Sequence, residues 1–213
     1  TGNYGGLQMP AIYQNGMVMQ RDRYLPVGGS ADAGSRITVT LAGHTYKTTT
    51  DNCGRWAVTA LPLQAGGPYE LTASDGQRTL RFTDTVAGEV WIASGQSNME
   101  FPLRDATGAQ ADIADSADPQ LRFYDMKAIA RTNNEQWPDS IIEAMDRLGH
   151  FKPTTWSAVG SGTAGDLSAV AYYFARQLRD SLHVPVGIIS NAVGGVLLPL
   201  LTMLTKEEKQ HGN

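Results

Sequence analysis

The sequence predicts an α/β domain preceded by a small β-sandwich domain, and three observations carry this prediction. Residues from about 17 to 90 contain short β-rich runs with turn residues between them, roughly every 8 to 12 positions. The run 89–94 is almost continuously apolar, as in a parallel strand covered on both faces. A helix-spaced segment and another apolar run then follow, and this order favours a parallel sheet. We place the two domains at 1–86 and 87–213.

The first region shows strand periodicity. Ile37, Val39 and Leu41 alternate with polar residues and share one face of a predicted strand. Asp75-Gly76 is a strong two-residue hairpin signal. The expected strands are 36–41, 45–50, 55–59, 69–73 and 78–83.

The second region alternates strands with helix. We expect strands at 89–94, 121–126 and 186–190. Apolar residues at helical spacing predict a helix that ends near His183 and is capped by Asp166 or Ser168; they are Leu167, Val170, Ala171, Phe174, Leu178 and Leu182. The polar stretch 104–161 predicts long surface loops with one short helix over 140–148.

Composition excludes several classes of function. Hydrophobic residues make up 41% of the 213 residues, charged residues 18%, and the net charge is -4. This balance is ordinary for a globular protein and leaves no basic patch for nucleic acid or an anionic membrane. The longest apolar stretch, 193–204, is interrupted and too short to span a bilayer. The single cysteine, Cys53, sits in a predicted turn and allows no internal disulfide.

One serine lies where an open α/β sheet binds ligands. Ser97 follows the apolar run 89–94, just past the carboxyl end of the expected strand. Gly95 lets the backbone turn sharply, and a helix that begins after Ser97 would point N–H groups at an oxyanion beside the hydroxyl. Position 99 is Met, so this is not the Gly-x-Ser-x-Gly elbow of α/β-hydrolases. By spacing alone, Gly-x-Ser favours a structural turn serine.

The residues on both sides of Ser97 favour a different interpretation. The segment 88–103, with Gly-Gln-Ser-Asn-Met at 95–99, closely resembles the first signature block of the sialate O-acetylesterase family within the SGNH hydrolases. The resemblance continues in the Asp-x-x-Gly-x-Trp turn at 51–56 and in segments that match at 15–23, 65–71, 174–178 and 184–189. It implies a flavodoxin-like, three-layer α/β/α domain of the SGNH type, with Ser97 as the nucleophile.

The resemblance also implies an oxyanion hole. The second block of the family would be Asn-Ala-Val-Gly-Gly at 191–195, and Gly195 would supply a main-chain N–H, with Gly194 as the less certain donor. The amide of Ser97 would be the other donor. A simple tight turn remains an alternative for Gly194.

After Gly195 the sequence departs from the family. The family continues with Thr or Ser and then Pro-Ile-Glu-Ala-Trp, whereas residues 196–204 here read Val-Leu-Leu-Pro-Leu-Leu-Thr-Met-Leu. The Gln-Gly-Glu and Asp-x-x-His blocks are absent from the 213 residues, so we expect an incomplete α/β domain. The open sheet would then be completed by a companion chain or by self-association.

The sequence holds no evident general base. Its histidines are His44, His150, His183 and His211, and none has Asp three residues before it. Surface or helix-capping roles fit them better than catalysis. Since a serine nucleophile needs a base, this loss bears directly on activity.

We expect hydrolysis of O-acetyl esters on carbohydrates, with 9-O-acetyl sialic acid as substrate. Acetylated xylan or pectin is the alternative within the same reaction class, and a non-catalytic carbohydrate- or partner-binding fragment is the alternative outside it. Arg104 and Arg122 are candidates for a basic residue near the substrate. No metal or organic cofactor is expected. The family resemblance places the protein in the periplasm or outside the cell.

Overall fold

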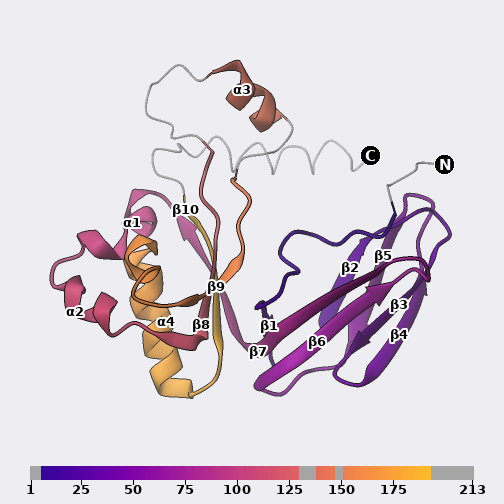
Figure 1. Cartoon of the computed structure of the whole chain (residues 1–213), viewed down its shortest axis with the longest axis horizontal. Helices are drawn as coiled ribbons and strands as arrows, with labels where there is room; N and C mark the ends of the chain where they lie inside the picture. The colour runs from indigo at the N-terminus through magenta and orange to yellow at the C-terminus, as the bar shows by residue number, and fades with distance from the viewer. Residues whose placement is uncertain (1–5, 130–137, 147–150, 193–213) are drawn as a thin grey trace, which may run out of the picture.

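The computed structural model describes residues 6–129, 138–146 and 151–192. Among these residues, eight strands form one mixed sheet, in which seven strands follow the order β4-β3-β6-β7-β10-β8-β9 and β1 pairs with β7 (Figure 1). Two further strands, β2 and β5, form a separate antiparallel sheet. The parallel α/β part and the N-terminal strands are therefore joined through one strand, β7.

The N-terminal strands are β1 (Val18–Gln20), β2 (Leu25–Ser30), β3 (Arg36–Leu41), β4 (His44–Thr49), β5 (Arg55–Ala60) and β6 (Gly66–Ser74). The last four match expected strands, whereas β1 and β2 were not among the strands that the sequence predicted. Ile37, Val39 and Leu41 are all buried on one face of β3, as expected from their period of two. Trp56 on β5 is buried in the same apolar cluster. The cluster thus lies between the β2-β5 sheet and the end of the larger sheet.

Strand β7 (Thr79–Gly95) is the main departure from the predicted elements. The expected strands 78–83 and 89–94 are parts of this one strand, which first pairs with β6 and β1 and then with β10. Gly88 lies at the junction, and a glycine is required there because a Cβ would lie only 1.9 Å from the backbone oxygen of Pro185. The expected domain boundary at 86/87 falls inside β7, and the division into two domains stays a prediction.

The α/β part has three parallel strands. β10 (Val186–Ala192) lies between β7 and β8 (Asp118–Asp125), although β8 comes earlier in the chain. β9 (Trp156–Val159) adds an antiparallel strand at the outer edge of β8. The sequence did not predict β9, because this short strand carries little periodic signal of its own.

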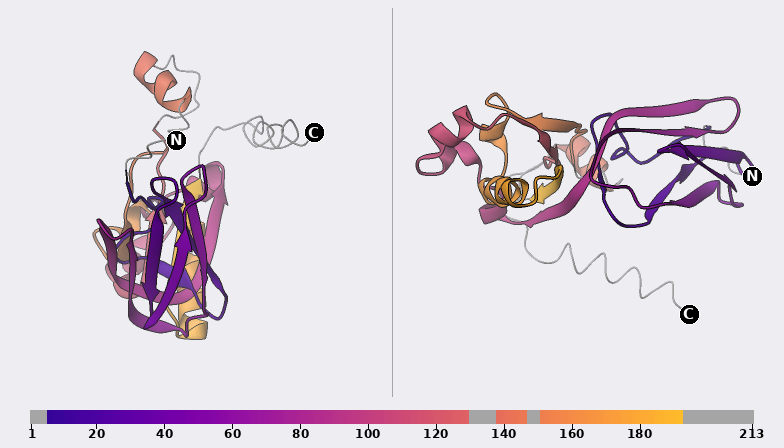
Figure 2. Two further views of the ribbon diagram at one scale, coloured as in Figure 1. Left: turned by 90° about the vertical axis from the view of Figure 1, so that its right-hand side faces the viewer. Right: turned by 90° about the horizontal axis from the view of Figure 1, so that it is seen from below.

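Helices cover one face of this sheet. α4 (Ala169–Leu182) buries Ala171, Tyr172 and Ala175 against the strands, and α1 (Ser97–Glu100), η1 (Leu103–Asp105), α2 (Ala109–Ala114) and η2 (Ala164–Asp166) lie at its edges (Figures 1 and 2). α3 (Asp139–Asp146) falls within the predicted helix 140–148 apart from its first residue, and 147–148 lie outside the described residues. On the opposite face, Tyr124 and Trp156 join the apolar cluster of the N-terminal strands. The three-layer, SGNH-type arrangement therefore stays a prediction, since the described helices supply one layer.

Candidate active site

Ser97 lies at the carboxyl end of β7, as the sequence predicts. β7 ends at Gly95, and Ser97 is the first residue of α1, a helix of one turn. The turn is closed by Met99 and Glu100, whose N–H groups both donate to the backbone oxygen of Gln96 at 2.9 Å. Ser97 itself is exposed. A hydroxyl is thus presented at the edge where parallel sheets bind their ligands.

The turn into α1 requires a glycine. A Cβ built on Gly95 would lie 2.9 Å from the Cβ of Met99, closer than side-chain carbons approach in real structures. The absence of a side chain at Gly95 therefore lets α1 fold back over the end of β7. This is the role that the sequence assigned to Gly95.

The segment after Ser97 is fastened to the start of α4. The hydroxyl of Ser168 accepts a hydrogen bond from the N–H of Ala171 at 3.2 Å and so caps α4, and it donates to the sulfur of Met99 at 3.4 Å. The backbone adds two bonds, from Leu103 N to Leu167 O at 2.8 Å and from Ala169 N to Phe101 O at 2.9 Å. The position of Ser97 is thus set by β7 on one side and by α4 on the other.

The end of β10 lies beside the end of β7. Asn191 pairs with Ser94 and Ala192 with Gly95, in parallel register. The second expected block begins here, but its oxyanion-hole residues Gly194 and Gly195 lie outside the described residues. Their role stays a prediction. The register shows that the expected block at 191–195 begins beside Gly95.

Neither described histidine is near Ser97. His44 is exposed at the start of β4, and His183 forms the left-handed C-cap of α4 with φ 54°. α4 is followed by the amino end of β10, and β10 runs alongside β7 from the pair Val186–Glu89 to the pair Ala192–Gly95. Since strands rise about 3.3 Å per residue, His183 lies roughly 20 Å from the edge that carries Ser97. His150 and His211 lie outside the described residues.

The two arginines considered for substrate binding have other partners. Arg122 is buried, and its guanidinium donates to the backbone oxygens of Pro119, Gly16 and Asp84, so it is a structural residue and the expectation for it was wrong. Arg104 forms ion pairs with Asp105 and Asp166.

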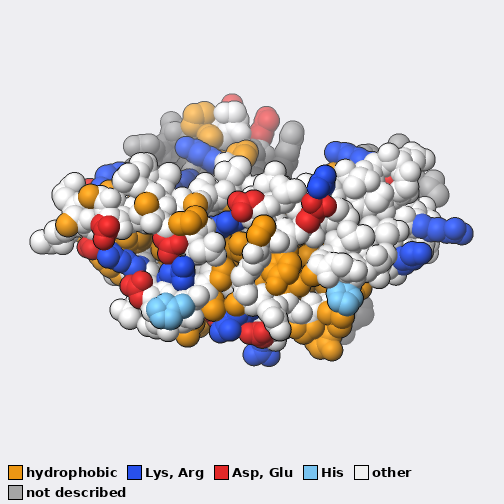
Figure 3. All heavy atoms as spheres, turned by 60° about the horizontal axis from the view of Figure 1, so that its bottom comes forward, with side chains coloured by type: hydrophobic (Ala, Val, Ile, Leu, Met, Phe, Trp, Pro, Cys, Tyr) orange, Lys and Arg blue, Asp and Glu red, His pale blue; other side chains and the backbone are white. Residues whose placement is uncertain are grey.

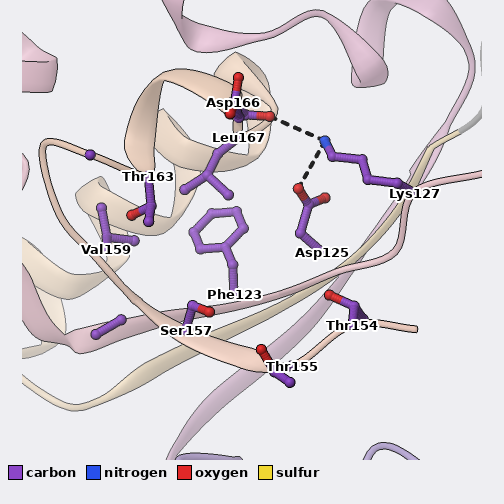
Figure 4. A pocket seen from close by; sticks show the side chains of 12 residues that line it. Phe123, Asp125, Lys127, Thr154, Thr155, Ser157, Val159, Thr163, Asp166 and Leu167 are labelled. Carbon is purple, nitrogen blue, oxygen red and sulfur yellow. Dashed lines mark hydrogen bonds and ion pairs between the residues drawn. The ribbon is translucent and has the colours of Figure 1, made fainter. Parts of the chain in front are cut away.

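A cavity opens at the carboxyl end of β8, at the same edge of the sheet. Asp125 ends β8, and its carboxylate pairs with the ammonium group of Lys127 at 2.8 Å (Figure 4). Sequence reasoning missed both residues. The available signal was a polar residue directly after the buried run 121–124, at the end of an expected parallel strand.

In 6–129, 138–146 and 151–192, no group of three or more His, Cys, Asp or Glu side chains is arranged to hold a metal ion. None of the helices in these ranges has the length and apolar character needed to cross a bilayer.

Comparisons with known proteins agree with the sequence resemblance. No family model matches the chain. The chain is 30% identical over 208 residues to the sialate O-acetylesterase of Mus musculus and 32% identical over 205 residues to that of Rattus norvegicus, covering 91% and 89% of this chain. A crystal structure described as a novel carbohydrate acetylesterase from Xanthomonas citri has a TM-score of 0.75 and 31% identity over 90% of this chain.

These relatives are longer than this chain. The chain spans 37% and 36% of the two curated enzymes and 41% of the solved chain. The matches cover nearly all of the sequence, including the strand, turn and helix around Ser97. The chain therefore belongs to the sialate O-acetylesterase family.

Proposed function

We propose that the protein hydrolyses O-acetyl esters on carbohydrates, with Ser97 as the nucleophile and 9-O-acetyl sialic acid as the substrate. One observation carries the proposal. Ser97 begins a helix directly past the carboxyl end of β7, beside the end of the parallel strand β10, in a chain whose relatives are named as acetylesterases. The geometry supplies two features that support a serine esterase, because the hydroxyl is exposed and lies at a helix N-terminus.

In the proposed reaction, the Oγ of Ser97 attacks the carbonyl carbon of the acetyl group. The proton of Ser97 passes to a general base, and the N–H groups of Ser97 and Gly195, with Gly194 as the alternative, hold the oxyanion. The first N–H groups of a helix have no acceptor within it, so the amide of Ser97 suits this task. Collapse of the intermediate breaks the bond between the carbonyl carbon and the sugar oxygen, and this oxygen takes the proton from the base and leaves as a hydroxyl. Water then attacks the acetyl-serine, which releases acetate and restores the hydroxyl of Ser97.

The base comes from outside the described residues in this proposal. His183 lies at the opposite edge of the sheet, and His44 belongs to the N-terminal strands. We propose that a companion polypeptide brings the histidine and its orienting acid. This is in keeping with relatives of which the chain spans only 36–38%.

The structure offers an edge for such a companion. The N–H of Glu89 donates toward the β10 side, whereas the N–H of Val86 donates to Met17 on the β1 side. Backbone groups alternate between the two edges of a strand, so Ile92 and Ser94 face the β1 side, where β1 has already ended opposite Gly88. Ile92 is 70% exposed. On the face that Figure 3 draws, hydrophobic side chains gather near the middle and at the lower right.

Among the described residues, no strand pairs with this part of β7 on the β1 side, and a strand edge of this kind with apolar side chains favours association. Without its companion, the isolated chain should self-associate through this edge. Light scattering that finds a stable, monodisperse monomer would contradict this part of the proposal.

The decisive experiment measures acetate release from 9-O-acetyl sialic acid and from acetylated xylan by the chain together with the companion that supplies the base, with Ser97→Ala as the control. Release that disappears in the variant supports a serine esterase and names the better substrate. The plant polysaccharide is the second candidate because the solved neighbour is described only as a carbohydrate acetylesterase. Release from neither substrate favours a non-catalytic binding module, the alternative suggested by the distant histidines. For its location we propose the periplasm or the extracellular space, to be checked by cell fractionation.

A further inference from the structure

The cavity at the end of β8 is open to solvent on one side and has a volume of about 280 Å³. Its walls come from β8, from β9 and from the loop 160–167 that leads into α4 (Figure 4). The volume is close to the lower limit of about 300 Å³ for pockets that hold small molecules. The space is therefore suited to a single small ring rather than to a large ligand.

The cavity combines apolar and hydroxyl-binding surfaces. Phe123 and Leu167 form an apolar part, and Figure 4 shows the hydroxyls of Thr155, Ser157 and Thr163 around it. Thr163 is engaged with the backbone of Gly160. The hydroxyls of Thr155 and Ser157 form no hydrogen bond with another described residue, so both are free to bind a ligand.

The charges in the cavity are balanced. Lys127 contacts the carboxylate of Asp125 at 2.8 Å and donates to the backbone oxygen of Asp166 at 3.1 Å. The carboxylate of Asp166 is paired with Arg104, which lies outside the cavity lining. Among the described residues that line the cavity, Lys127 is the only cation, and it is already paired. An anionic ligand would meet two carboxylates and no free cation.

The cavity lies close to Ser97. Both are at the carboxyl edge of the sheet, with β10 between β7 and β8. Neighbouring strands are about 4.8 Å apart, so the ends of β7 and β8 are separated by roughly 10 Å. The last residues of the cavity wall also hold the segment that follows Ser97 in place, since Leu167 O accepts a hydrogen bond from Leu103 N and Ser168 contacts Met99. A glycan that presents an acetyl group to Ser97 can thus reach the cavity with an adjoining sugar.

We propose that this cavity binds an uncharged pyranose unit of the glycan whose acetyl group is attacked by Ser97. This inference rests on the proposed function and adds a subsite to it. The apolar wall contacts the CH face of the ring, Asp125 accepts hydrogen bonds from its hydroxyls, and Ser157 donates one. The paired charge of Lys127 disfavours a sugar acid in the same place.

The test measures sugar binding without turnover. The Ser97→Ala chain is titrated with lactose, cellobiose and xylobiose as neutral probes, and with N-acetylneuraminate and galacturonate as anionic probes, while amide NMR signals of 157–163 are followed. We expect saturable shifts with at least one neutral probe and weaker binding of both anions. Tighter binding of either anion, or the absence of saturable shifts with every neutral probe, overturns the proposal.

Two variants and a control sharpen the test. Asp125→Asn should weaken neutral-sugar binding roughly tenfold or more, since a hydrogen bond to a charged group is worth about 1.5–3 kcal/mol. It should also strengthen N-acetylneuraminate binding, because Lys127 is left unpaired. Ser157→Ala, at an exposed edge position, should weaken neutral-sugar binding a few-fold. Thr59→Ala removes an exposed hydroxyl from β5 and should change nothing.

The outcome is separable from that of the proposed function. Acetate release with no sugar binding at 157–163 would remove the subsite and leave the esterase. Binding at these residues with no acetate release when the companion is present would remove the esterase, and the cavity would then be a sugar site alone. The expected gain in N-acetylneuraminate binding by Asp125→Asn is measured separately from both acetate release and neutral-sugar binding.

Discussion

The guanidinium group of Arg122 donates to the backbone oxygen of Asp84 at 2.6 Å and to its carboxylate at 3.1 Å, and so ties β8 to the middle of β7. Arg122 also donates to the backbone oxygen of Gly16 at 2.9 Å. Asp84 holds a left-handed backbone conformation, with φ 53°, directly before the part of β7 that pairs with β1. One buried cation thus joins the N-terminal loop, β7 and β8.

Replacing this arginine should destabilise the fold strongly. In Arg122→Met, the carbonyl groups of Gly16 and Asp84 lose the donor that the buried guanidinium group supplies, and we expect the free energy of unfolding to fall by about 2–4 kcal/mol. Urea denaturation followed by tryptophan fluorescence measures this. Asp84→Asn is the matched control and should cost less than about 1 kcal/mol, because Asn tolerates a positive φ and keeps the backbone acceptor. Equal losses in the two variants would assign the stabilisation to the exposed ion pair instead.

A methyl group at Gly95 should disturb the turn that presents Ser97. The new Cβ would lie 2.9 Å from the Cβ of Met99, so α1 must shift away from the end of β7. Overpacking of this kind costs about 1–3 kcal/mol. Gly160→Ala is the control, since a Cβ there meets no heavy atom within 4 Å. Thermal unfolding of both variants tests the contrast, and Gly95→Ala that is as stable as Gly160→Ala would show that the turn relaxes freely.

Ser168 should stabilise the start of α4 more than an ordinary surface serine does. Ser168→Ala removes the N-cap acceptor for Ala171 N and the contact with Met99, and we expect a loss of about 1 kcal/mol in the free energy of unfolding. Ser181, in the last turn of the same helix, bonds only to Gln177 in the described structure. Ser181→Ala should stay within about 0.5 kcal/mol of the parent. A smaller loss at position 168 than at 181 would argue against the cap.

Much of the local structure was predictable because it depends on periodicity. The alternation of Ile37, Val39 and Leu41 predicted β3, and helical spacing predicted α4 with Asp166 or Ser168 as its cap, of which Ser168 is the one observed. The continuity of β7 was not predictable in this way. Its two halves carry different patterns, half-buried and then apolar, because different partners cover them, and only the pairing with β6, β1 and β10 makes them one strand.

The site divides along the same line. The place of Ser97 after a buried strand followed from local sequence, since a strand, Gly95 and a helix start determine it. Asp125 and Lys127 line a cavity only because β8, β9 and the loop 160–167 meet in space. These segments are far apart in the sequence, so no local sequence pattern indicates the cavity. Arg122 seemed available for substrate because burial, which depends on the tertiary fold, is invisible in its neighbours along the chain.

The acidic link between α2 and α4 should make stability depend on pH. Asp112 accepts hydrogen bonds from the hydroxyl of Tyr173 at 2.8 Å and from the guanidinium group of Arg176 at 2.7 Å. These two hydrogen bonds lower the pKa of Asp112 below its ordinary value of 3.8, and the bond from Tyr173 contributes more than the bond from Arg176. A carboxyl group whose pKa is lower in the folded than in the unfolded chain stabilises the fold above the unfolded pKa, and this contribution is lost as the pH falls through the folded pKa.

Asp112→Asn should therefore lower the free energy of unfolding at neutral pH and make progressively less difference as the pH falls below about 4. The side chain of Asp112 is partly exposed, so solvent screens the effect and the loss should be small, as for other surface ion pairs. Urea denaturation of both proteins at a series of pH values gives the difference directly. Glu70→Gln, which breaks the surface pair with Arg81 far from α2, controls for the general change in charge. The stability difference between Asp112→Asn and the parent depends on pH only if the pKa of Asp112 is shifted by folding. A difference that stays constant from neutral to acidic pH would therefore show that the loss comes from the shape of the new side chain.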